Sequence, residues 1–263
     1  MKLNNLEIVS ITKFGLLLLL TFAISACAGV SKYGDTNTSW KEEVALHDGQ
    51  TMIVKHTFKR GGRREPGQMP NAIYESLAFT PPNSHQTVLW ENKKTEDIGN
   101  SNFRPLLLDI VDNTPYLVTN ALGCLSYNKW GRPNPPYIVF KYDGNAWQRI
   151  TLQELPAQLT TPNLIVNSAD TVAAKAGSNL ISAATIKSFN STLIHKEYKT
   201  ILREPVENAG GRCGEMIYDG KGGWHGVGWF KDNPSLEACV SYCNRQKITA
   251  EYCPCNRFFK GSE

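Results

Sequence analysis

The sequence predicts a mainly β fold of antiparallel hairpins, either a sandwich or a partial propeller, with short helices in its middle and a disulfide-rich C-terminal tail that contains a helix. Short apolar or alternating segments recur from residue 43 to residue 152, and clusters of turn residues separate them. No segment in this part has the period of an amphipathic helix. Most of the seven cysteines follow residue 205, which sets the tail apart from the β part.

Two hairpins are expected at the start of the folded chain. Residues 43–46 and 51–58 are joined by His47-Asp48-Gly49-Gln50, in which Asp-Gly is a strong hairpin signal. Residues 73–79 and 87–90 repeat the pattern, and the prolines between them cannot continue a strand ladder. In both pairs apolar and polar residues partly alternate, which predicts that one face of each hairpin packs against a core.

Two further strand pairs complete the predicted β part. Residues 106–111 and 116–122 are apolar enough to be buried strands. The clearest hairpin joins residues 137–142 to residues 147–152 across Asp143-Gly144-Asn145. We expect no helix between these strands.

Helix formers become common after the strands. They predict short helices over residues 169–175 and 182–189, with Ser182 as the N-cap of the second. Residues 198–202 fit a strand or a helix end equally well. In the tail, Asn233 and Pro234 have the pattern of an N-cap followed by a first helical residue, which predicts a helix over residues 235–247.

The N-terminal segment resembles the signal of a bacterial lipoprotein. An uncharged run from residue 14 to residue 29 contains Ile24-Ser25-Ala26-Cys27, which is similar to a lipobox. The run is shorter than the roughly 20 residues of a spanning helix, and the placed cysteine favours lipidation over plain secretion. The resemblance implies cleavage before Cys27 and a lipid anchor on its thiol. Ala28 is not the aspartate of an inner-membrane retention signal, so we expect the outer membrane, facing the periplasm.

These features divide the chain into a signal peptide (1–26), a lipidated tether (27–39), a mainly β body (40–205) and a Gly/Cys-rich C-terminal subdomain (206–263). Lysine and arginine number 28 against 24 aspartates and glutamates. This balance is too even for a surface that tracks phosphates, so no nucleic-acid partner is expected. The body needs no membrane-binding surface of its own, because lipid chains supply the anchor.

The remaining cysteines predict disulfide bonds, since their number is even and the periplasm is oxidising; they are Cys124, Cys213, Cys239, Cys243, Cys253 and Cys255. Neither pair in the tail is spaced to bridge itself. We therefore expect Cys239 or Cys243 to pair with Cys253 or Cys255, and Cys124 to pair with Cys213. A tetrathiolate zinc site is the competing interpretation of the four tail cysteines. In an oxidising compartment we expect bridges, with no metal and no cofactor.

No catalytic set is evident in the sequence. The five histidines lack a metal-ligand spacing, and His47 is expected to be solvated in its turn. Asp109 and Asp112 flank a strand end where a carboxylate pair could act as acid and base, but Asp112-Asn113 is also ordinary turn chemistry. No catalytic residue is therefore assigned.

Two stretches are candidate ligand surfaces. One is a proline-rich loop and the other is a glycine-rich segment, and both contain residue types that anchor interfaces. The candidate ligand-binding residues are Trp130, Arg132 and Tyr137 in the first, and Trp224, His225 and Trp229 in the second. The alternative interpretation is that these aromatic side chains cover an edge of the core.

Three stretches resemble an uncharacterised family of proteobacterial lipoproteins or exported proteins; they are Trp40-Lys-Glu-Glu-Val, residues 125–137, and residues 203–206 followed by 210–216. This resemblance implies no known activity. The preferred hypothesis is a lipid-anchored envelope protein that acts as a non-enzymatic binding or protective module for an envelope protein or cell-wall partner. The alternatives are a periplasmic hydrolase of an envelope polymer and a structural component of an envelope assembly.

Overall fold

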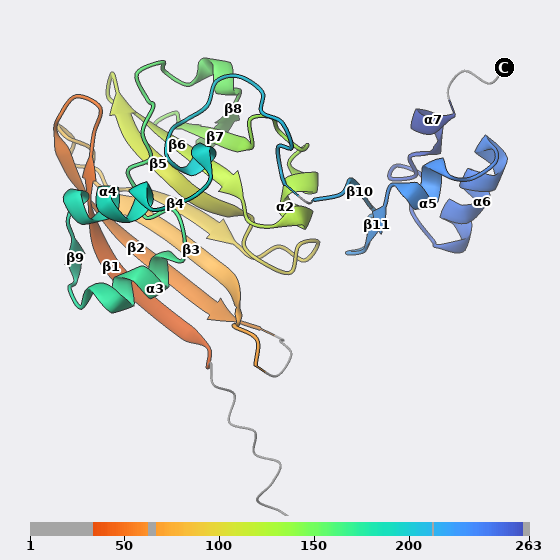
Figure 1. The fold of residues 1–263 in the computed structure, drawn as a ribbon, viewed down its shortest axis with the longest axis horizontal. Coiled ribbons are helices and arrows are strands. Elements are labelled where there is room, and N and C mark those ends of the chain that lie inside the picture. Colours follow the sequence, from red (N-terminus) through yellow and green to blue (C-terminus); the bar gives the residue numbers. More distant parts are fainter. Residues whose placement is uncertain (1–33, 63–66, 212, 260–263) are drawn as a thin grey trace, which may run out of the picture.

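The computed structural model describes residues 34–62, 67–211 and 213–259. The predicted signal peptide, the lipidated Cys27 and the first part of the tether lie outside these residues. Two antiparallel sheets pack face to face as a sandwich, and a small C-terminal subdomain stands beside it (Figure 1). The predicted mainly β fold is confirmed.

The first sheet has the strand order β4-β3-β2-β1-β9. The first predicted hairpin is formed by β1 (Thr36–Ala45) and β2 (Thr51–Gly61). The second is formed by β3 (Asn71–Phe79) and β4 (Val88–Lys93), and the short β9 (Leu180–Ile181) pairs in parallel with β1. Strand β1 begins before Trp40, where we expected a tether, because residues 36–39 continue the ladder against β2.

The second sheet is a meander of four strands, β5 (Phe103–Val111), β6 (Thr114–Ala121), β7 (Tyr137–Tyr142) and β8 (Trp147–Ile150). Asp112 and Asn113 both have positive φ, as a two-residue hairpin turn requires. One face of this sheet contacts the first sheet, and residues from the segment 155–201 cover the other. Burial on both faces explains why residues 106–110 are apolar almost without interruption, Asp109 excepted.

Three helical segments surround the sandwich. Helix α2 (Cys124–Lys129) interrupts the β part where no helix was expected. The two predicted helices are present as α3 (Ala169–Ala176) and α4 (Ala183–Ser191), and the Ser182 hydroxyl accepts a hydrogen bond from the Thr185 N–H as the predicted N-cap. Residues 152–154 and 196–198 form single 3₁₀ turns, so the predicted strand ending at residue 152 is shorter and Tyr198 ends a turn.

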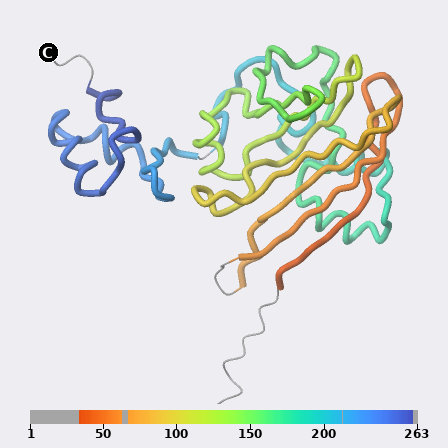
Figure 2. Tube along the Cα trace, turned by 180° about the vertical axis from the view of Figure 1, so that it is seen from behind, coloured from red at the N-terminus to blue at the C-terminus, as the bar shows by residue number. Residues whose placement is uncertain are grey.

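The C-terminal subdomain consists of a short hairpin, β10 (Met216–Tyr218) and β11 (Trp224–Gly226), and three helices, α5 (Gly228–Lys231), α6 (Leu236–Arg245) and α7 (Cys255–Phe258). The N-cap of α6 is Ser235, whose hydroxyl accepts from the Ala238 N–H. The expected cap Asn233 instead donates to carbonyls of the preceding turn of helix. Seen from behind, the subdomain projects from one end of the sandwich (Figure 2).

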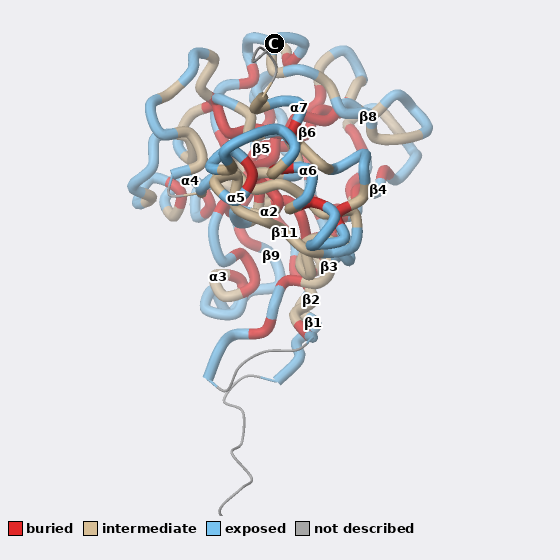
Figure 3. The backbone as a smooth tube through the Cα atoms, turned by 90° about the vertical axis from the view of Figure 1, so that its right-hand side faces the viewer, coloured by how far each residue is buried: buried red, intermediate tan, exposed pale blue. Residues whose placement is uncertain are grey.

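Buried residues concentrate in the strands of the sandwich, and the loops around it are mostly exposed, except for buried positions such as residues 164–166 (Figure 3). The main apolar cluster takes side chains from both sheets, and a second cluster lies where α3 and α4 cover the far end of the first sheet. Among the described residues, no helix combines the length and apolar character needed to cross a bilayer.

Candidate functional site

Three disulfide bonds join the six predicted cysteines. Cys124 pairs with Cys213, Cys239 with Cys255, and Cys243 with Cys253. Two bridges therefore connect α6 to the tail, and one connects the β body to the subdomain, as the sequence predicts. Cys239, Cys243 and Cys255 are buried, whereas Cys124 is exposed at the start of α2.

The bridge between Cys124 and Cys213 is reinforced by polar contacts from the proline-rich loop and α2. Asn128 donates to the Gly214 carbonyl at 3.0 Å and accepts from the Met216 N–H at 2.9 Å. Arg132 donates to the same Gly214 carbonyl at 3.0 Å. These contacts place the start of the subdomain against α2.

The three candidate residues of the proline-rich loop have structural partners. Trp130 packs on Phe103 with ring centroids 4.8 Å apart, and its indole N–H donates to Asn102. Tyr137 is 4 % exposed, and its hydroxyl donates to the Glu197 carbonyl at 2.9 Å. Burial raises the pKa of this hydroxyl to about 12. The loop thus closes an edge of the core and holds the subdomain through Arg132, and Tyr137 presents little surface to a ligand.

The candidate residues of the glycine-rich segment differ in exposure. Trp224 is half-buried, and its indole N–H donates to the Asp97 carbonyl of the body at 2.7 Å. His225 lies 3.6 Å from an Asp219 carboxylate oxygen and next to the Trp229 ring, with centroids 6.0 Å apart. Trp229 is 60 % exposed. Among the six tryptophans, all of which lie in the described residues, Trp229 alone is exposed.

His47 and Asp109 form a pair that connects the two sheets. The His47 imidazole Nδ1 lies 2.8 Å from Asp109 Oδ1, and the His47 backbone N–H donates to Oδ2 at 2.9 Å. Burial raises the pKa of Asp109, and its hydrogen bonds from His47 and Ile110 oppose this only in part. His47 was expected to be solvated, but its ring is mostly covered because it packs into this pair.

A hollow of about 320 Å³ adjoins this pair and is also lined by Gln158, Thr160 and Lys187. In the part of the chain that the structure describes, no hydroxyl or thiol is hydrogen-bonded to the imidazole of His47. The nucleophile that the pair could activate is therefore a water molecule. Asp112, the other predicted carboxylate, is an exposed turn residue and does not bond to the pair.

A row of four polar side chains crosses the inner face of the first sheet, which we call the polar row; it consists of Glu42, His56, Glu75 and Asn92, one from each of β1 to β4. His56 contacts Glu42 through Nδ1 and Glu75 through Nε2, each at 2.8 Å. All four residues are buried. The row separates the main apolar cluster from the cluster under α3 and α4.

Every carboxylate oxygen of the polar row has a hydrogen-bond donor. Glu42 also accepts from the Trp40 indole at 2.8 Å and from the Ile165 N–H at 3.1 Å, and Glu75 accepts from Asn92. Burial alone would lower the pKa of His56, but its hydrogen bonds with the two glutamates raise it to about 9. At neutral pH the row therefore contains an imidazolium between two carboxylates.

The sequence contains one signal of this row. Glu42 and His56 each lie two residues from an apolar side chain, Val44 and Val54, on the same inward face of their strand. A charged side chain at an inward position needs a partner, and His56 has one on each neighbouring strand, Glu42 on β1 and Glu75 on β3.

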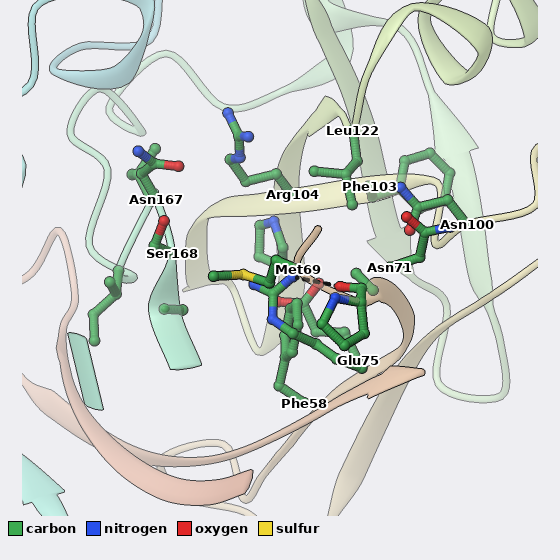
Figure 4. A pocket seen from close by; sticks show the side chains of 17 residues that line it. Phe58, Met69, Asn71, Glu75, Asn100, Phe103, Arg104, Leu122, Asn167 and Ser168 are labelled. Atoms are coloured by element: carbon green, nitrogen blue, oxygen red, sulfur yellow. Dashed lines mark hydrogen bonds between the residues drawn. The ribbon is translucent and has the colours of Figure 1, made fainter. Parts of the chain in front are cut away.

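A pocket of about 340 Å³ lies next to the polar row, between the ends of the two sheets. Figure 4 shows Glu75 and Phe58 of the first sheet on one side, Arg104 of the second sheet and Leu122, which follows β6, on the other, and Met69 between them. Its lining also includes Arg60, whose guanidinium bonds to both oxygens of Asp170. Because Glu75 and Arg60 are already paired, the pocket is better suited to binding than to proton transfer.

No family model, curated protein or solved structure matches the chain.

Proposed function

We propose that this protein is a lipid-anchored protein of the bacterial cell envelope that binds an envelope protein or the cell wall and is not an enzyme. The lipobox-like Ile24-Ser25-Ala26-Cys27 supports the anchor, and Ala28 supports the outer membrane, facing the periplasm. The three paired bridges agree with an oxidising compartment.

One observation supports binding as the activity: Trp229 is exposed on a braced part of the subdomain. Its neighbour Phe230 is fully buried, which fixes the direction of α5. The Trp229 ring lies 6.1 Å from that of Tyr242 on α6, the helix that carries two bridged cysteines. A rigid, exposed tryptophan loses little conformational entropy on binding, which is why tryptophans are common in the centres of interfaces.

The test is crosslinking in intact envelopes, followed by capture of the protein and identification of what is attached, together with co-sedimentation on isolated cell-wall sacculi. We expect Trp229→Ala to reduce capture of the specific partner by about 30-fold, which corresponds to about 2 kcal/mol.

Ile194→Ala is the matched control, because Ile194 is an apolar side chain that is 92 % exposed on the β body. It should leave capture unchanged. If Trp229→Ala captures the same proteins as the wild type and co-sediments equally with sacculi, this surface is not the binding site.

The His47–Asp109 pair supports a second candidate function, a hydrolase that acts on an envelope polymer. A buried carboxylate that orients an imidazole is the arrangement that activates water in general-base catalysis. The adjoining hollow of about 320 Å³ gives such a reaction a place to occur.

This candidate is tested by incubating the purified protein with isolated sacculi and measuring soluble fragments. Asp109→Asn keeps the side-chain shape but removes the charge that holds the histidine, so a hydrolase should slow by about 10²–10⁴-fold. If the wild type releases no fragments, or the variant releases them equally fast, the pair has only a structural role.

A further inference from the structure

The two bridges of the subdomain lie side by side, so that the sulfurs of four cysteines come together. Cys243 Sγ lies 3.6 Å and Cys253 Sγ lies 3.5 Å from Cys255 Sγ, although Cys255 is bonded to neither. The sulfurs of Cys243, Cys253 and Cys255 are all within 4.8 Å of one another. The fourth sulfur, that of Cys239, is bonded to Cys255 and so adjoins the same group.

We propose that these four cysteines are a convertible site, which binds one Zn²⁺ as a tetrathiolate when both bridges are reduced. Four sulfurs at about 2.3 Å from a tetrahedral zinc ion are about 3.8 Å apart. On reduction, the two bonded pairs would have to open to this spacing, whereas the contacts between the bridges already have nearly that length.

A dithiol reductant supplies the electrons that convert the two bridges into four thiols. Reduction of each bridge breaks one S–S bond and adds two electrons and two protons, while the reductant forms its own disulfide. Zinc then binds four thiolates, and each thiol releases one proton to solvent. Without zinc the reduced state is a subdomain with four buried or half-buried thiols.

The backbone holds the four positions together by contacts that do not depend on the bridges. Ser235 caps α6, which fixes Cys239 and Cys243 on one face of that helix. Lys247 adopts a left-handed conformation, and the Ile248 N–H donates to the Cys243 carbonyl at 3.0 Å, which turns the chain back toward the helix. The same loop can therefore present Cys253 and Cys255 to either bridges or zinc.

The subdomain also needs a constraint of this kind. Its cluster of buried residues consists of Phe230, Ile248 and three of the cysteines. So few apolar side chains do not stabilise a fold without bridges or a metal. A zinc ion would replace the bridges as the constraint in a reducing environment.

The test uses the full-length purified chain, reduced with a phosphine under anaerobic conditions and then titrated with Zn²⁺ or Co²⁺. We expect about one metal ion per chain after gel filtration, and the visible absorption of tetrahedral thiolate-bound cobalt. In Cys243→Ser/Cys253→Ser the bound metal should fall from about one ion per chain to near zero.

The control is Cys124→Ser/Cys213→Ser, which removes the bridge to the body and leaves the four cysteines intact. It should bind metal like the wild type. A second readout is proteolysis of the reduced wild type, in which zinc should restore the resistance of residues 214–259. The proposal is overturned if the reduced wild type retains no metal, if Cys243→Ser/Cys253→Ser retains as much as the wild type, or if zinc gives no protection.

Discussion

The β body and the C-terminal subdomain are stabilised in opposite ways. The body buries apolar side chains from two sheets and from the helices that cover them, and it contains no disulfide of its own among the described residues. The subdomain has a cluster of five buried residues, three of which are cysteines. The body is held by its core, and the subdomain is held by covalent bonds.

This difference determines which of the two regions can bury charged side chains. The body is large enough to enclose the polar row, because every carboxylate of the row is bonded and apolar clusters lie on both sides. The subdomain encloses no comparable group in the described residues, and its His225–Asp219 contact lies near the surface. A single substitution should therefore damage each region by a different mechanism.

The largest effect is expected from His56→Leu in the body. The substitution removes the imidazolium and leaves Glu42 and Glu75 buried without the partner they share. We expect a loss of about 3–5 kcal/mol in the free energy of unfolding of the body, measured by denaturant titration.

Lys55→Ala is the control, because Lys55 precedes His56 on the same strand but is exposed on the opposite face. Its effect should stay within about 0.5 kcal/mol. A similar small effect of His56→Leu would mean that the polar row is not a charged network.

Raising the pH should weaken the body through the same histidine. Its pKa is raised from 6.5 to about 9 in the folded state, so the stabilisation is complete below about pH 6.5 and is lost as the pH rises through about 9. We expect the body to lose about 3 kcal/mol over this window. Denaturant titrations at pH 6.5, 8 and 9.5, together with a His56→Leu series that should be flatter, check this prediction.

Removing one tail bridge should affect the subdomain and spare the body. Cys243 and Cys253 are separated by 10 residues, so Cys243→Ser/Cys253→Ser relaxes the unfolded chain and should cost about 2–3 kcal/mol. Hydrogen exchange of residues 214–259 under oxidising conditions should accelerate accordingly. Exchange in β2 and β6 should not change, and a parallel acceleration there would show that the two regions unfold as one unit.

The hairpins of the body were predictable because strand period and turn chemistry are local. His47-Asp48-Gly49-Gln50 and Asp112-Asn113 act within their own hairpins, so no knowledge of the fold was needed. Helix α2 was missed because it has only six residues and no side-chain cap, and it follows a glycine with φ 92°. A segment this short is stabilised by its tertiary contacts rather than by its own pattern.

The candidate site also combines features that local sequence predicts with features that depend on tertiary contacts. That α6 is bridged to the tail and Cys124 to Cys213 was predictable, since spacing excluded the pairs within the helix and within the tail, but the partner of each tail cysteine was left open. The polar row and the His47–Asp109 pair were not, because their members come from different strands and meet only through strand register and the packing of one sheet on the other. Trp224 and Trp229 lie in the same glycine-rich segment, and the sequence does not distinguish their roles. The structure does, because Trp224 bonds to the Asp97 carbonyl of the body whereas Trp229 is exposed.

The smallest effect concerns the segment that joins the two regions. Gly210 has φ 79°, and an added Cβ would clash with the ring of Tyr127, a buried residue of the body. Gly211 has φ 60° but nothing within 4 Å of its Cβ position, so Gly211→Ala shares the backbone strain without the clash. We expect Gly210→Ala to cost about 1–2 kcal/mol more than Gly211→Ala in the unfolding of the body.

Since Tyr127 belongs to the core of the body, the extra cost should be absent from hydrogen exchange in α6. If it appears in α6 instead, the joining segment is part of the subdomain and the boundary between the two regions lies before residue 210.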